Sequence, residues 1–183
     1  ANVANISDVR KIARFSWQLA EKGHAMPLTA RGYGTDATGG AIGSGIIVSP
    51  VKYMHHIIGI DPRQRLIHVE AGASYDEVNA ALSTHRGMRL PNPSFHSQNG
   101  SIGGAVAAGS AGYFSARYGT VGQAVRNLEV VLANGDVLQT ERLTKGKVNS
   151  KKGLHTMEGE VYRKIDNLIS DNKELIDSLA KGP

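Results

Sequence analysis

Glycine is concentrated in two short stretches of this 183-residue chain. Residues 32–45 contain six glycines and residues 100–122 contain seven, so 13 of the 22 glycines occupy 37 positions. Glycine permits backbone conformations and close approaches that a side chain forbids. Two separate glycine-dense stretches therefore indicate that another group approaches the main chain in two places. This feature constrains the fold and the function more than any other.

The pattern before residue 88 predicts a small α/β unit with some parallel strand pairing. Apolar spacing predicts an amphipathic helix that starts at Ser7 and ends at Gly23, and a capped helix over 74–85. Strands are expected over residues 25–30, 46–48 and 65–71, and a turn or a short helix over residues 51–58.

The pattern changes in the second part of the chain. The small residues of 102–112 predict a short helix lying close to another backbone or a ligand. Asn134-Gly135, between apolar runs 128–133 and 136–140, predicts a hairpin with a type I′ turn. Five basic residues between Arg142 and Lys152 predict a solvated linker, followed by one long helix over 158–180.

Composition and charge limit the possible functions. The absence of cysteine excludes disulfides, thiolate metal sites and cysteine nucleophiles. The net charge of +5 and the pI near 9.5 suit an anionic partner. The basic run lacks aromatic residues that would stack on bases, so no nucleic acid is expected as a partner. No apolar run reaches the ~20 residues of a membrane span. No signal pattern is visible, which favours a cytoplasmic location, although a removed leader remains an alternative.

The first glycine stretch has the composition of an anion-binding loop. Arg31-Gly32-Tyr33-Gly34-Thr35-Asp36 follows a predicted strand, and alternating glycines can turn main-chain N–H groups toward a phosphate. A flexible surface loop is an equal alternative. The spacing from Gly32 to Ala37 also fits a dinucleotide fingerprint, but Thr38-Gly39-Gly40 would start a helix poorly. A Walker loop is excluded because no Gly-Lys-Ser/Thr follows.

The second stretch allows two interpretations as well. Between Ser101 and Gly112 nearly every side chain is small, which suits either a large ligand or tight helix–sheet packing. Taken together, the two stretches favour two walls of one elongated cofactor site. The pair His55-His56 lacks the spacing of a metal site, so no metal is expected.

The ordered motifs resemble the FAD-binding domain of the vanillyl-alcohol oxidase / p-cresol methylhydroxylase (PCMH) flavoprotein superfamily. RGYGTDATGG, LPNPS, SIGGAVAAGSAG, ARYGTVGQAV and NLEVVLANGDV occur in that family's order over about residues 7–140, nearest the D-lactate dehydrogenase and glycolate oxidase branch. The resemblance implies an α+β (α/β) fold with a small, partly parallel βαβ subdomain followed by an antiparallel-sheet subdomain. Residues 1–88 would form the first FAD-binding subdomain and 89–140 the start of the second, with 141–183 as basic linker and C-terminal helix.

The resemblance also implies the binding residues. The loop would wrap the FAD pyrophosphate, two residues would lie near the flavin, the small residues would line the second wall with Ser101 as a donor, and Gly119 would belong to the turn entering the hairpin. These residues are Arg31, Gly32, Tyr33, Gly34, Thr35 and Asp36; Pro91 and Ser94; Ser101, Gly103, Gly104, Ala107, Gly109 and Gly112; and Gly119. Members that tether FAD covalently through the first loop have histidine where this chain has Thr35, so non-covalent FAD is expected.

The resemblance implies an FAD-linked oxidoreductase that oxidises a 2-hydroxy acid or a related alcohol by hydride transfer to flavin. The alternative is a non-catalytic nucleotide- or anion-binding module that retains the fold. The family's later glycine-rich segment and its substrate-binding cap are not in this sequence, so we expect the N-terminal part of a longer enzyme. The fold would be incomplete at the C-terminus, and no catalytic residue is assigned.

Overall fold

The computed structural model describes residues 1–91 and 100–180, apart from the side chain of residue 180. The chain divides into two compact units. Unit 1 comprises Ala1–Arg126 and Val131–Gly135, and unit 2 comprises Asn127–Val130 and Asp136–Pro183. No helix within the described ranges combines the length and the hydropathy that crossing a membrane requires.

Unit 1 begins with a helix and a parallel strand pair. Helix α1 (Ile6–Glu21) is capped by Asn5, whose side chain accepts a hydrogen bond from the Asp8 amide, so the start predicted at Ser7 is wrong. Strands β1 (Leu28–Ala30) and β2 (Ile46–Val48) pair in parallel, with Leu28 opposite Ile46. The first glycine stretch connects them directly, without a crossover helix.

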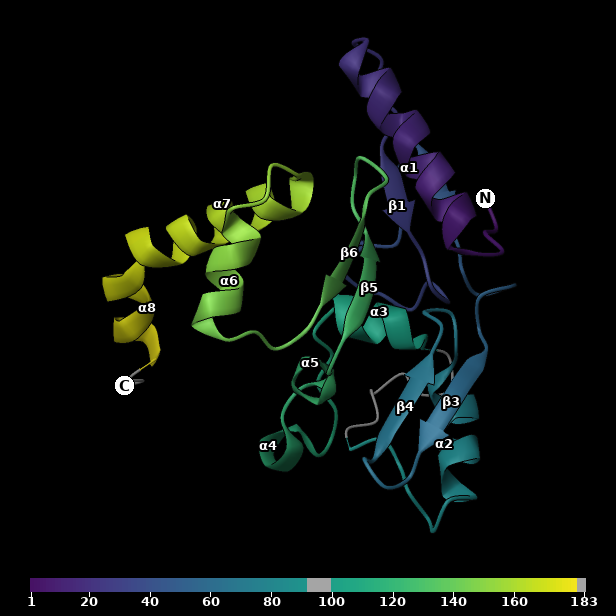
Figure 1. Ribbon diagram of the computed structural model, residues 1–183. Coiled ribbons are helices and arrows are strands. Elements are labelled where there is room, and N and C mark those ends of the chain that lie inside the picture. The colour runs from purple at the N-terminus through teal and green to yellow at the C-terminus, as the bar shows by residue number, and fades with distance from the viewer. Residues whose placement is uncertain (92–99, 181–183) are drawn as a thin grey trace. The chain divides into compact units, whose positions relative to one another are not determined.

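The next elements of unit 1 form a hairpin covered by a helix. Strands β3 (Ile57–Asp61) and β4 (Leu66–Val69) pair antiparallel, and α2 (Tyr75–Ser83) lies against them (Figure 1). Strand β3 was not predicted, because its first residues fell in the segment interpreted as a turn or a short helix. Ser74 caps α2 as predicted, in a complete capping box with Glu77.

Three short helices complete unit 1. These are α3 (Ile102–Ala107), α4 (Ser115–Tyr118) and α5 (Val121–Ala124). Leu90 and Ile102 pack against two buried clusters at once, and this shared packing holds α3 against α2. The first cluster is Ala73, Val78 and Leu82; the second is Tyr75, Ala105 and Val121.

Strands β5 (Leu128–Val131) and β6 (Val137–Thr140) form the predicted hairpin, but its turn differs from the prediction. Gly135 has a φ of +83°, whereas Asn134 is not among the residues with positive φ, so the turn is not type I′. Residues 132–136 connect the two strands, so the connection has five residues instead of two. Within it the Gly135 amide donates a hydrogen bond to the Leu132 carbonyl. The Arg10 side chain donates to the Gly135 carbonyl at 3.1 Å and fixes this longer turn against α1.

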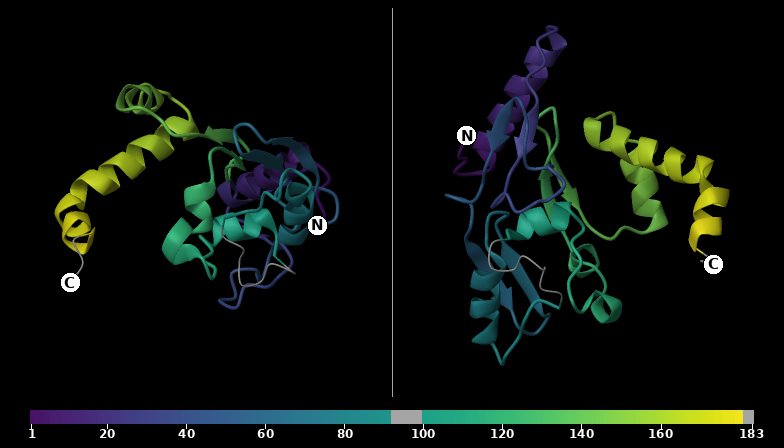
Figure 2. Two further views of the ribbon diagram at one scale, coloured as in Figure 1. Left: turned by 90° about the horizontal axis from the view of Figure 1, so that it is seen from below. Right: turned by 180° about the vertical axis from the view of Figure 1, so that it is seen from behind.

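Unit 2 contains two departures from the predicted elements (Figure 2). Residues expected in a solvated linker form helix α6 (Lys145–Lys152), because Thr144 caps it and Lys151 pairs with Glu158 at 2.5 Å on the following helix. The single helix expected over 158–180 is divided into α7 (Met157–Asp171) and α8 (Lys173–Ala180). The break falls at Asn172, whose side-chain amide donates to the Leu168 carbonyl at 2.8 Å.

Candidate functional site

The first glycine loop leaves β1 in a fixed conformation. The Arg31 amide bonds to the Val48 carbonyl at 2.9 Å, and Gly34 has a φ of +76°, where a side chain would be strained. Asp36 then accepts hydrogen bonds from the amides of Thr38 at 3.0 Å and Gly40 at 2.7 Å. These bonds, first of all that from the Thr38 amide, lower the pKa of the Asp36 carboxyl. The loop is therefore ordered by its own side chain and not by burial.

The amides of this loop are free to bind an anion. Within the described residues, none of the five consecutive main-chain N–H groups from Gly32 to Asp36 donates a hydrogen bond. The Arg31 guanidinium donates to the Ala41 carbonyl at 3.2 Å and lies directly beside Gly34, so a positive charge accompanies these donors. Successive free amides with a nearby cation make the surroundings that a phosphate requires.

In the second glycine stretch, the main-chain amides at the start of α3 already donate hydrogen bonds within the protein. The amides of Ile102 and Gly103 donate to the carbonyls of Ala73 and Ala71, both at 2.8 Å. The Gly104 amide donates to the Ser101 hydroxyl at 3.1 Å. The first three amides of α3 are therefore used within the protein and are not free to bind an anion.

The two stretches meet at Ser101. This residue is 4% exposed, and a Cβ built on Gly32 would lie 2.3 Å from its hydroxyl oxygen. The close approach is possible only because residue 32 has no side chain. The structure therefore brings the two predicted walls together, although they lie about 70 residues apart in the sequence.

The glycines of the predicted second wall divide into two groups. A Cβ on Gly103 would lie 2.8 Å from the Ala71 carbonyl oxygen, so tight packing inside the protein explains that glycine. Gly109, with a φ of +56°, has open space around it, and Gly104 and Ala107 are exposed. These three form the side-chain-poor surface that a bound group can reach. Tight packing thus explains Gly103, whereas contact with a large ligand stays a prediction for Gly104, Ala107 and Gly109.

The other predicted binding residues are more scattered. Gly112 is buried, and its amide donates to the Ser115 hydroxyl at 2.8 Å. Gly119 ends α4 with a φ of +79° and precedes α5, not the hairpin. Pro91 is exposed at the end of a described range, and Ser94 lies outside the described residues.

Tyr33 and Thr35 are exposed residues of the first glycine loop. Partial burial, and after it the Glu77 carboxylate, raise the pKa of the Tyr33 phenol. Glu77, on the first turn of α2, therefore acts electrostatically on the loop.

The histidine pair lies on the segment before β3. The His55 and His56 rings stack with centroids 5.0 Å apart, and His56 Nδ1 lies 2.7 Å from a Glu70 carboxylate oxygen. His55 Nδ1 is buried without a hydrogen-bond partner in the part of the chain that the structure describes. No group of three or more potential metal-binding His, Cys, Asp or Glu side chains forms among the described residues.

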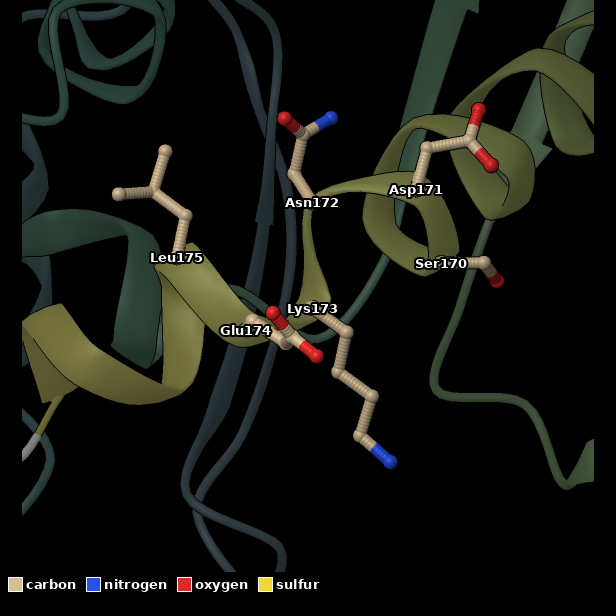
Figure 3. Close-up of a pocket in the computed structure, with 6 residues that line it drawn as sticks. All are labelled: Ser170, Asp171, Asn172, Lys173, Glu174 and Leu175. Carbon is tan, nitrogen blue, oxygen red and sulfur yellow. The ribbon is translucent and has the colours of Figure 1, made fainter.

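A hollow at the α7–α8 junction is lined by six consecutive residues, Ser170–Leu175. Their side chains point away from one another (Figure 3). Because they do not converge on a common point, this hollow is not a candidate binding site.

Sequence reasoning missed the residues that hold the second glycine stretch against the start of α2. Ser74 was recognised only as a helix cap and Ala71 only as the end of a predicted strand, and Ala73 was assigned no role. A capping-box pattern shows that Ser74 starts a helix. Nothing in the local sequence shows that Ser74 pairs with Ser101 in an isolated antiparallel bridge.

Comparison with known proteins agrees with this geometry. The profile described as "FAD binding domain" matches residues 1–141. A D-2-hydroxyglutarate dehydrogenase of Pantoea ananatis is 31% identical over 170 residues, which are 93% of this chain and 16% of that protein. The glycolate oxidase subunit GlcD of Bacillus subtilis is 34% identical over 119 residues, 64% of this chain and 25% of that protein.

Solved structures show the same fold. 6-Hydroxy-D-nicotine oxidase from Arthrobacter nicotinovorans superposes with a TM-score of 0.65 at 23% identity, over 77% of this chain and 29% of that chain. The expected α+β fold of the PCMH type is thereby confirmed. The chain spans between 13% and 17% of the length of the D-2-hydroxyglutarate dehydrogenases that it matches. The profile covers well over half of the chain, and the chain belongs to the FAD-binding domain family of flavoproteins.

Proposed function

We propose that this chain binds FAD non-covalently and is the FAD-binding portion of an oxidoreductase acting on a 2-hydroxy acid or a related alcohol. The observation that carries the proposal is the row of five free amides at 32–36, beside the Arg31 guanidinium and against the N-cap of α3. The relatives named as dehydrogenases and oxidases of hydroxy acids support the reaction class.

The residues fit a dinucleotide. The amides of Gly32, Tyr33, Gly34, Thr35 and Asp36 would donate to the pyrophosphate, while Arg31 would offset its charge. The open surface at Gly104, Ala107 and Gly109 would let the cofactor lie against α3. We assign the roles of Pro91, Ser94, Ser101, Gly103, Gly112 and Gly119 as flavin-side or wall residues on the family resemblance. Residues 1–88 and 89–140 would be the two FAD-binding subdomains.

The chain's own contribution to the reaction is positional. When bound, FAD supplies the hydride acceptor for oxidation of the substrate carbon. The loop fixes the pyrophosphate end, and the α3 surface limits where the remainder of the cofactor can lie. No residue of this chain is assigned as the substrate base. Thr35 carries only a hydroxyl, and acid precipitation should therefore release all bound flavin into the supernatant.

An FAD titration of the purified chain tests the proposal. We expect saturable quenching of flavin fluorescence and a flavin absorption spectrum. In Ala107→Leu, a larger side chain on the exposed face of α3 should abolish uptake without unfolding the chain. Ala80→Leu, an equivalent change on the exposed face of α2, is the matched control and should bind FAD normally.

Two outcomes would contradict the proposal. Absence of uptake by the wild-type chain at high FAD would leave the alternative, an anion-binding module that retains the fold without the cofactor. Equal uptake by wild type and Ala107→Leu would place the cofactor elsewhere.

A further inference from the structure

The N-terminal ends of α2 and α3 are fastened to each other. Ser74 caps α2, Ser101 caps α3, and the two residues pair in an antiparallel bridge. The Tyr75 amide donates to the Gly100 carbonyl at 3.2 Å, and the Ile102 amide donates to the Ala73 carbonyl at 2.8 Å. Movement of one cap must therefore move the other.

Glu77 holds this junction from the α2 side. One oxygen, Oε2, accepts hydrogen bonds from the Ser74 amide at 3.1 Å and from the Ser74 hydroxyl at 2.8 Å. The Ser74 hydroxyl in turn accepts from the Glu77 amide at 3.2 Å. Glu77 thus fixes both the main chain and the side chain of the residue that pairs with Ser101.

The junction continues to the first glycine loop. Ser101 lies against Gly32 so closely that a Cβ there would approach its hydroxyl oxygen to 2.3 Å. A continuous set of contacts therefore runs from Glu77 through Ser74 and Ser101 to Gly32. Gly32, at the end of this set, carries the first of the five free amides.

We propose that Glu77 is a positioning residue for FAD, which holds the α2–α3 junction so that the loop amides and the α3 surface face the same cofactor. This inference rests on the proposed function of the chain. Glu77 itself does not contact FAD; it acts through Ser74 and Ser101. Its negative charge is not needed for this role, since the two Ser74 donors require only one acceptor oxygen.

Substitutions at Glu77 separate positioning from general stabilisation. Glu77→Ala removes the oxygen that accepts both hydrogen bonds from Ser74, and we expect the Kd for FAD to rise about five- to tenfold, which corresponds to about 1–1.4 kcal/mol. Glu77→Gln keeps an amide oxygen that can accept both Ser74 donors, and its Kd should lie within about twofold of wild type. Glu77→Asp keeps the charge but shortens the side chain, and its Kd should rise as in Glu77→Ala.

Asn5→Ala is the matched control for loss of a helix cap. Asn5 lies in the same unit, and its cap hydrogen bond is made with the Asp8 amide at the start of α1, so its loss should lower the melting temperature and leave the Kd unchanged. Both the melting temperature without FAD and the Kd are measured for every variant.

The outcomes distinguish this inference from the proposed function. If the wild-type chain takes up no FAD, the proposed function fails and this inference falls with it. If wild type binds FAD but Glu77→Ala and Asn5→Ala change the Kd alike, only the positioning role is refuted. Failure of Glu77→Gln to restore the Kd, with Glu77→Asp near wild type, would refute it also, because charge would then be the property that matters. If Glu77→Ala does not fold, the comparison of Glu77→Asp with Glu77→Gln decides.

Discussion

Addition of one methyl group at Gly32 tests directly whether the two glycine stretches meet. In Gly32→Ala the new Cβ would lie 2.3 Å from the Ser101 hydroxyl oxygen and 3.2 Å from the Ser101 Cβ. The first distance is impossible, so either the hydroxyl rotates away or the loop moves. Rotation breaks the hydrogen bond from the Gly104 amide at 3.1 Å, which caps α3.

The expected loss of unfolding free energy in Gly32→Ala follows from these two alternatives. Loss of a helix cap costs about 1 kcal/mol, and overpacking of a close contact costs about 1–3 kcal/mol. We therefore expect Gly32→Ala to lower the free energy of unfolding by about 1–3 kcal/mol. In a Ser101→Ala background the obstructing oxygen is absent, and the remaining Cβ–Cβ contact needs a shift of only a few tenths of an ångström. There the same substitution should cost about 1 kcal/mol less.

A double-mutant cycle measures this difference. The four proteins are unfolded with urea in the absence of FAD and followed by circular dichroism and by the fluorescence of Trp17, the single tryptophan. The effect of alanine on the unfolded chain is the same in both backgrounds and cancels in the cycle. A coupling within about 0.5 kcal/mol of zero would refute the reasoning, because residues that do not touch are expected to be additive within that limit.

Three further results are expected. Gly103→Ala should lower the free energy of unfolding by about 1–3 kcal/mol with or without FAD, since its Cβ would meet the Ala71 main chain at 2.8 Å; an unchanged urea midpoint would contradict this. Burial raises the pKa of Tyr75 to about 12, and the residue is 2% exposed. The unfolded chain therefore ionises this phenol at a lower pH than the folded chain does, and stability falls by on the order of 3 kcal/mol as the pH rises from 10 to 12. Tyr75→Phe should lose less stability over this interval, as measured by urea unfolding at each pH. Burial acts to raise the pKa of Glu70, but hydrogen bonds from the His56 amide and imidazole outweigh it and leave the pKa lowered. Stability from this carboxylate is present above its ordinary pKa and is lost as the pH falls through the lowered value, so Glu70→Gln should show a shallower loss of stability in acid; parallel curves would contradict the role of this pair.

The sequence predicted elements whose cause is local. The capped helix α2 follows from the Ser74–Glu77 spacing, and strand β2 follows from a short apolar run ended by Pro50. The sequence also predicted that the residues around Gly32 and Gly104 allow close approach, because the absence of a side chain is a property of each residue alone. Order and spacing of the motifs were sufficient to recognise the FAD-binding fold.

Where a local signal competed with a distant contact, the prediction was wrong. Asn134-Gly135 favours a two-residue type I′ turn, but contact of the turn with Arg10 accompanies a longer one. Lys151 and Lys152 suggested a solvated linker, whereas their partners Glu158 and Asp166 on α7 hold them in a helix. Glu158 lies seven residues after Lys151, and Asp166 lies fourteen residues after Lys152. Pairing over such separations cannot be predicted from the local sequence pattern.

Only the tertiary structure decided what each glycine does. Gly103 and Gly104 are neighbours with the same composition around them, yet one packs against the Ala71 main chain and the other faces outward. The sequence determined that the chain could build two side-chain-poor walls. The approach of Ser101 to Gly32 determined that these walls meet, and a contact between residues about 70 positions apart leaves no pattern in the sequence around either one.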